Sequence, residues 1–131
     1  TVDTNAVGTY VLTYNVSDSA GNAAAQVTRT VNVSDVTAPV ITLVGPANSA
    51  LNLGDTYTEQ GATAVDNVDG DISSNINIAG DTVDTNAVGT YVVTYNVSDA
   101  NSNSAQEVTR TVNVVSNLSV EENSKPSNSC S

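Results

Sequence analysis

The densest group of potential ligand atoms lies in the stretch Asp66-Asn67-Val68-Asp69-Gly70-Asp71. Carboxylate and amide oxygens are hard ligands of the kind that Ca²⁺ prefers. Gly70 permits the tight bend that could turn such oxygens inward. Carboxylates this close together repel one another, and a divalent cation would relieve that repulsion. The stretch therefore predicts a calcium site whose ligands are Asp66, Asn67, Asp69 and Asp71.

Two acids elsewhere in the chain are candidates for additional ligands of the same ion. Asp35 precedes a predicted strand, and Asp99 lies at the end of another. The spacing is not that of an EF-hand, because Val68 stands where the second ligand would be. Ca²⁺ at a domain junction would stiffen a chain of repeats. The alternative is a solvated turn in which aspartates cap backbone N–H groups without a metal.

The composition excludes several classes of function. The chain of 131 residues has 14 acidic residues against three cations, which gives a net charge of -11. Such a charge repels nucleic acid and anionic membranes, so neither is an expected partner. No apolar stretch approaches the roughly 20 residues of a membrane helix, so membrane insertion is not expected. The sequence has no histidine. A Ser-His-Asp triad or Cys-His pair cannot be built, and no enzyme is predicted.

An internal repeat divides the chain. Residues 1–33 align without a gap with residues 82–114, at an offset of 81, and 26 of the 33 positions are identical. Such similarity indicates a recent tandem duplication. We expect residues 1–34 to be the C-terminal fragment of a preceding repeat and residues 35–115 to be a complete repeat. Residues 116–131, which contain Cys130, are expected to be a disordered tail or linker.

Alternating apolar residues predict short strands throughout the complete repeat. The expected strand regions are 40–44, around Leu51 and Leu53, 61–64, 72–78, 89–99 and 105–114, with residues 45–48 as a turn. Tyr91, Val93, Tyr95 and Val97 share one face of the clearest strand. Arg110 shares a face with core valines, so its head should reach a carboxylate, unless a bulge turns it outward. About seven strands and no helix predict an all-β, two-sheet sandwich.

Several motifs of the repeat together resemble the bacterial immunoglobulin-like surface-protein repeats. Gly89-Thr90-Tyr91-Val92-Val93 is similar to an immunoglobulin F-strand motif with Val93 in place of the cysteine. The other matching motifs are Asp35 to Ile41, Gly61 to Ala64, Asp66 to Ile72 and Tyr95 to Asp99. The resemblance implies an immunoglobulin-like sandwich in a tandem array, secreted or exposed on a cell surface. It implies no single activity.

The leading functional prediction is a non-catalytic structural or spacer repeat of an extracellular or cell-surface adhesin-like protein. Its expected partners are neighbouring repeats of the same polypeptide. Near-identical repeats suit a spacer, because a spacer needs length and stiffness more than a unique site. The alternative is an accessory module of a secreted multidomain protein that binds polysaccharide or a host surface.

Overall fold

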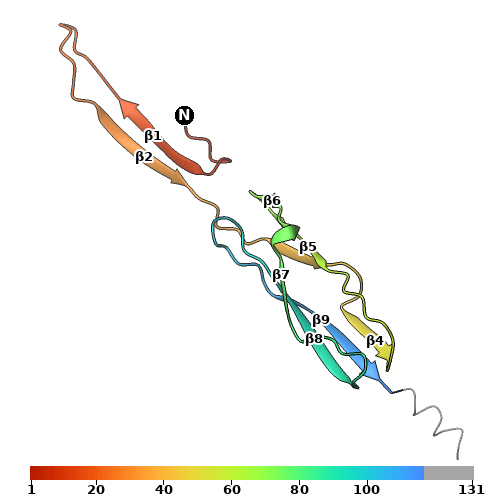
Figure 1. Cartoon of the computed structure of the whole chain (residues 1–131). Coiled ribbons are helices and arrows are strands. Elements are labelled where there is room, and N and C mark those ends of the chain that lie inside the picture. Colours follow the sequence, from red (N-terminus) through yellow and green to blue (C-terminus); the bar gives the residue numbers. More distant parts are fainter. Residues whose placement is uncertain (117–131) are drawn as a thin grey trace, which may run out of the picture. The chain divides into compact units, whose positions relative to one another are not determined.

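The computed structural model describes residues 1–116, and these residues form an all-β protein with one short 3-10 turn (Figure 1). Contacts divide the chain into two compact units. The first contains β1 and β2, and the second contains β3 to β9. The described residues include no helix long and apolar enough to cross a membrane.

The second unit is built from two sheets. One sheet has three strands in the order β3 (Val40–Leu43), β5 (Ala62–Asp66) and β6 (Gly70–Asp71). The other has four strands in the order β4 (Asn48–Asn52), β9 (Val108–Val115), β8 (Gly89–Asn96) and β7 (Asn77–Gly80). The 3-10 turn η1 (Ser73–Asn75) precedes β7. Strand β4 pairs with β9 in parallel, whereas β7, β8 and β9 pair antiparallel.

The core of the second unit lies between these two sheets. Ile41 and Ala64 come from the three-stranded sheet, and Val93 and Tyr95 come from β8. Side chains alternate across a strand, and β8 buries Val93 and Tyr95 while Thr90 and Val92 face outward. The predicted two-sheet sandwich and the predicted inward face of β8 are both confirmed.

The first unit repeats the β8–β9 hairpin. Strands β1 (Gly8–Tyr14) and β2 (Val27–Val33) pair antiparallel from Gly8↔Val33 to Tyr14↔Val27. The pairing of β8 with β9 runs from Gly89↔Val114 to Tyr95↔Val108. Adding 81 to both residue numbers of each pair in β1–β2 gives the corresponding pair in β8–β9. The sequence repeat is also a repeat of strand register.

Some element boundaries differ from the sequence prediction. Asn48 was expected in a turn, but it begins β4, and Leu53 lies outside that strand and is exposed. The acidic stretch is not an open loop, because Gly70 and Asp71 form β6 and pair with β5. The last strand begins at Val108. Except for residue 116, the predicted tail lies outside the described residues.

Candidate metal site

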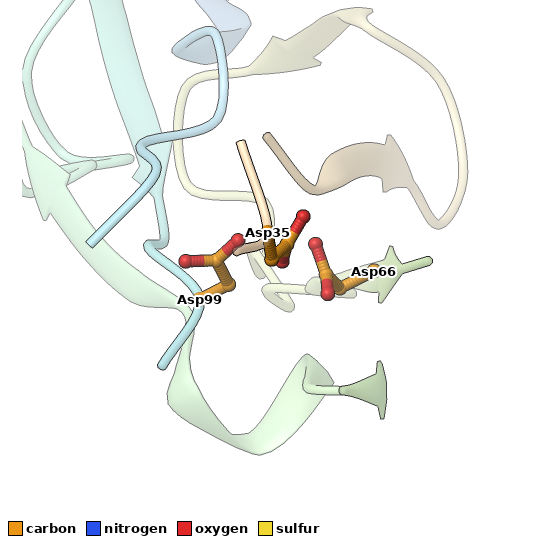
Figure 2. A group of neighbouring side chains, drawn as sticks. All are labelled: Asp35, Asp66 and Asp99. Carbon is orange, nitrogen blue, oxygen red and sulfur yellow. The ribbon is translucent and has the colours of Figure 1, made fainter. Parts of the chain in front are cut away.

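Three carboxylates from separate parts of the sequence converge in the structure (Figure 2). Asp35 lies in the segment between β2 and β3, Asp66 is the last residue of β5, and Asp99 follows β8. One carboxylate oxygen from each residue lies within 4.8 Å of the other two. The side chains are 7 %, 3 % and 7 % exposed, respectively, so all three are buried.

Asp66 holds the turn between β5 and β6 with only one of its oxygens. Its Oδ2 accepts hydrogen bonds of 2.9 Å from the backbone N–H groups of Val68 and Asp69. Gly70 has φ +76°, which a glycine adopts without strain, and so allows the tight return. The second oxygen, Oδ1, is buried and has no hydrogen-bond partner among the described residues. The turn therefore fixes the carboxylate and leaves one oxygen available.

Backbone N–H groups also fix the other two carboxylates. Asp99 Oδ1 accepts hydrogen bonds from the N–H groups of Asn101 and Asn103, at 2.9 and 2.8 Å. Asp35 Oδ1 accepts one from the N–H group of Thr37, at 3.0 Å. Each aspartate closes a turn two residues ahead, as aspartate commonly does. These bonds hold the carboxylates in defined positions.

The remaining residues predicted as ligands do not join this group. Asn67 is exposed. Asp69 Oδ2 accepts a 2.7 Å hydrogen bond from the N–H group of Ala100. Asp71 is exposed and accepts hydrogen bonds from the Ser73 hydroxyl and N–H group, which lower the pKa of Asp71. The side chains of a tight hairpin point in different directions, so neighbours in sequence do not share one site.

The separations of these three oxygens stay within the upper limit for ligands of one calcium ion. Ca²⁺ binds oxygen at about 2.4 Å, so two of its ligand oxygens can be at most about 4.8 Å apart. The three oxygens meet that limit. Ca²⁺ takes six to eight oxygens, and the rest would come from second carboxylate oxygens, backbone carbonyls and water. The donor set is all oxygen, which suits a hard cation.

A second polar cluster surrounds Arg110. Its guanidinium group donates hydrogen bonds to the carbonyl oxygens of Val44 and Gly61, at 2.5 and 3.2 Å. It also lies 3.6 Å from the Glu59 carboxylate. Arg110 is 2 % exposed. The prediction that its head reaches a carboxylate is correct, although the sequence did not identify Glu59 as the partner.

Glu59 is the centre of this second cluster. Its carboxylate accepts hydrogen bonds from the hydroxyl groups of Tyr57 and Tyr95 and from the N–H group of Gly61. Burial by itself would raise the pKa of Glu59, but these bonds and the positive charge of Arg110 outweigh it and hold the pKa below its usual value. Burial and the Glu59 carboxylate raise the pKa of Tyr95 and Tyr57. The cluster joins β8 and β9 to Val44 and Gly61, the residues directly after β3 and directly before β5.

The fold and repeated register define a class of protein, the immunoglobulin-like β-sandwich module. Comparison with known families makes the assignment specific. The family described as bacterial surface protein, Ig-like domain, matches residues 1–33 and 41–114, and the chain belongs to that family. The match includes the β1–β2 hairpin as well as the second unit, as the resemblance of the sequence motifs implied.

Individual relatives are longer proteins. The chain is 33% identical over 107 residues to an uncharacterized 81.3 kDa protein of Acholeplasma phage L2. The matched region covers 79% of this chain but only 14% of that protein. Among solved structures it is similar to the lipoprotein BT2262 from Bacteroides thetaiotaomicron, with 29% identity and a TM-score of 0.53. That match covers 60% of this chain and 38% of the lipoprotein.

A second solved structure contains CBM51-2, in complex with GlcNAc, and INT domains from Clostridium perfringens ZmpB. It is 30% identical to this chain, with a TM-score of 0.47, and the match covers 60% of this chain and 16% of that one.

Proposed function

We propose that this chain is a non-catalytic spacer repeat of a longer, adhesin-like protein that is secreted or exposed on a cell surface. Its partners are the neighbouring repeats of the same polypeptide. The observation that supports this most is the repeated hairpin, with the same pairing register in β1–β2 and β8–β9 at an offset of 81. Repetition conserves the internal fold of a module, which is what a spacer requires.

The sites available for a small ligand also favour a spacer. Three hollows of the described residues have volumes of about 270, 260 and 220 Å³, and Tyr57 is the one aromatic residue among their linings. Ligand sites are usually larger, at about 300–1,000 Å³, and are lined mainly by apolar and aromatic groups. The two tyrosines of β8, Tyr91 and Tyr95, match Tyr10 and Tyr14 of β1, and their contacts are within the fold. In β8, Tyr95 is fully buried, and the Tyr91 hydroxyl donates to the carbonyl of Ala87.

Proteins with increasing numbers of copies of residues 35–115 test the proposal by small-angle scattering. A spacer predicts that each added copy increases the maximum dimension by the same amount. A collapsed particle whose dimension stops increasing would contradict it.

A glycan-array screen of the same proteins tests the alternative. The spacer proposal expects no saturable binding at any copy number. Saturable binding that one copy of residues 35–115 already provides would instead favour the accessory binding module.

A further inference from the structure

We propose that Asp35, Asp66 and Asp99 bind one calcium ion, which ties the segment leading into β3 to the β5–β6 turn and to the loop after β8. Figure 2 shows the three carboxylates directed toward one another. Of the four ligands predicted within residues 66–71, the group contains Asp66, and its other members are the two additional ligands predicted at Asp35 and Asp99.

The unpartnered oxygen of Asp66 is the first argument for an ion. Asp66 is 3 % exposed, and within residues 1–116 its Oδ1 has no hydrogen-bond partner, although its Oδ2 accepts two hydrogen bonds. A buried charged oxygen without a partner is costly, so native proteins rarely retain one. A cation held jointly with Asp35 and Asp99 would satisfy this oxygen.

The three carboxylate ligands are already held in position by backbone hydrogen bonds. The Asp66 and Asp99 carboxylates are each fixed by two backbone N–H groups. The bond from the N–H group of Ala100 to Asp69 Oδ2 also links the β5–β6 turn to the loop that carries Asp99. Binding therefore needs little reorganisation of these two loops. Such preorganisation of ligands increases affinity.

The first hairpin contains a residue that corresponds to Asp99 but is not part of a carboxylate cluster among the described residues. Asp18 is the counterpart of Asp99 and makes the same hydrogen bonds, to the N–H groups of Ala20 and Asn22 and to the Asn22 side chain. Asp18 is exposed, and the metal-sized cluster found among the described residues does not include it. The proposal therefore predicts one bound ion for this chain.

Calorimetric titration of the full chain with CaCl₂, after removal of metals with a chelator, tests this directly. We expect one ion per chain, with a dissociation constant of about 10⁻⁴ to 10⁻³ M, as in extracellular modules. Thermal unfolding in about 10 mM CaCl₂ should show the midpoint of the second unit raised by about 5 °C or more relative to chelator.

Asp66→Asn separates metal binding from a structural role. The variant retains an oxygen that can accept from the turn, but it loses a charge. It should weaken calcium binding at least about tenfold, equivalent to about 1.4 kcal/mol. In chelator the same variant should unfold at a higher temperature than the unaltered chain, because one of three mutually repelling charges is gone. A purely structural aspartate would show a lower midpoint in both conditions.

Asp99→Asn and Asp18→Asn form the matched pair of controls. Both variants weaken the same type of turn, but only Asp99→Asn should abolish the calcium-dependent shift. The proposal would be overturned if the calorimetric titration with CaCl₂ released or absorbed no heat of binding and CaCl₂ left the unfolding midpoint unchanged. It would also be overturned if Asp66→Asn bound calcium as tightly as the unaltered chain. A shift produced by Mg²⁺ but not by Ca²⁺ would overturn the assignment of the ion.

Discussion

Arg110 and Arg29 are the same residue of the repeat in two environments. The guanidinium group of Arg110 lies 5.7 Å from the centre of the Tyr95 ring, and that of Arg29 lies 5.9 Å from the Tyr14 ring. Arg110 is enclosed by Val44, Gly61 and Glu59, whereas Arg29 is exposed. The difference comes from the strands that cover β9 and not from the arginine or its neighbours in sequence.

Alanine substitutions at these two positions should have very different effects. Arg110→Ala leaves Glu59 without its cation and removes the hydrogen bonds that the guanidinium group donates to the carbonyl oxygens of Val44 and Gly61. We expect a loss of about 3 kcal/mol in the free energy of unfolding. Arg29→Ala removes an exposed cation–π contact and should cost under about 1 kcal/mol. Urea unfolding of both variants measures this, and equal losses would contradict the structural role of Arg110.

Glu59 should make the second unit sensitive to acid. The pKa of Glu59 is below its unfolded value of 4.5. Its ionised form therefore contributes stability that is fully present above pH 4.5 and is lost as the pH falls through the folded pKa. Glu59→Gln should be less stable than the unaltered chain at pH 7, and the difference should narrow below pH 4.5. Urea unfolding at pH 7, 5, 4 and 3 tests this, and a difference independent of pH would refute it.

At the scale of elements, the loops after β1 and β8 have different residues at one position where the backbone φ angle is positive. Gly21 has φ +90°, and its counterpart Ser102 has φ +69°. Both N–H groups donate to the carbonyl oxygen of the aspartate three residues earlier, at 3.0 and 3.1 Å. The loop therefore requires a left-handed residue, which glycine adopts without the cost that a serine side chain incurs.

Exchanging these two residues should change stability in opposite directions. Ser102→Gly should raise the unfolding free energy of the second unit by about 1 kcal/mol, because it removes the left-handed strain. Gly21→Ser should destabilise the β1–β2 hairpin by a similar amount. Thermal unfolding and amide exchange measure the two effects, and a destabilising Ser102→Gly would show that the loop gains more from serine than the backbone strain costs.

Local patterns in the sequence predicted some features of the elements well. Alternation placed Val93 and Tyr95 in the core and indicated that Arg110 shares that face, because strand periodicity depends only on neighbours in sequence. The parallel pairing of β4 with β9 was not predicted, because it joins residues about 60 positions apart and leaves no local signal.

The candidate metal site was predicted in part for the same reason. Asp35, Asp66 and Asp99 were all named as ligands, but local density also pointed to Asn67, Asp69 and Asp71. Asp69 instead accepts a hydrogen bond from the N–H group of Ala100, and Asn67 and Asp71 are exposed. Which carboxylates meet depends on the packing of separate loops.

At the scale of the whole molecule, the first unit contains, within the described residues, the hairpin without the further strands that accompany its counterpart. Tyr14 is 47 % exposed, whereas the matching Tyr95 is fully buried. Val16 and Val27 are also exposed, at 68 % and 62 %. A lone two-stranded hairpin is marginal in water. Residues 36–81 provide β4 and β7, which flank the β8–β9 hairpin in its sheet, and β3, β5 and β6, which form the second sheet.

The most direct test of the repeat interpretation is hydrogen exchange on a chain that carries a second copy of residues 36–81 in front of Thr1. The account predicts that the added segment completes a second sandwich on β1 and β2. The amides of these strands should then become as protected as those of β8 and β9, and Arg29→Ala should become as destabilising as Arg110→Ala. A scrambled segment of the same composition is the control. Unchanged exchange in β1 and β2 with the genuine segment would contradict the account.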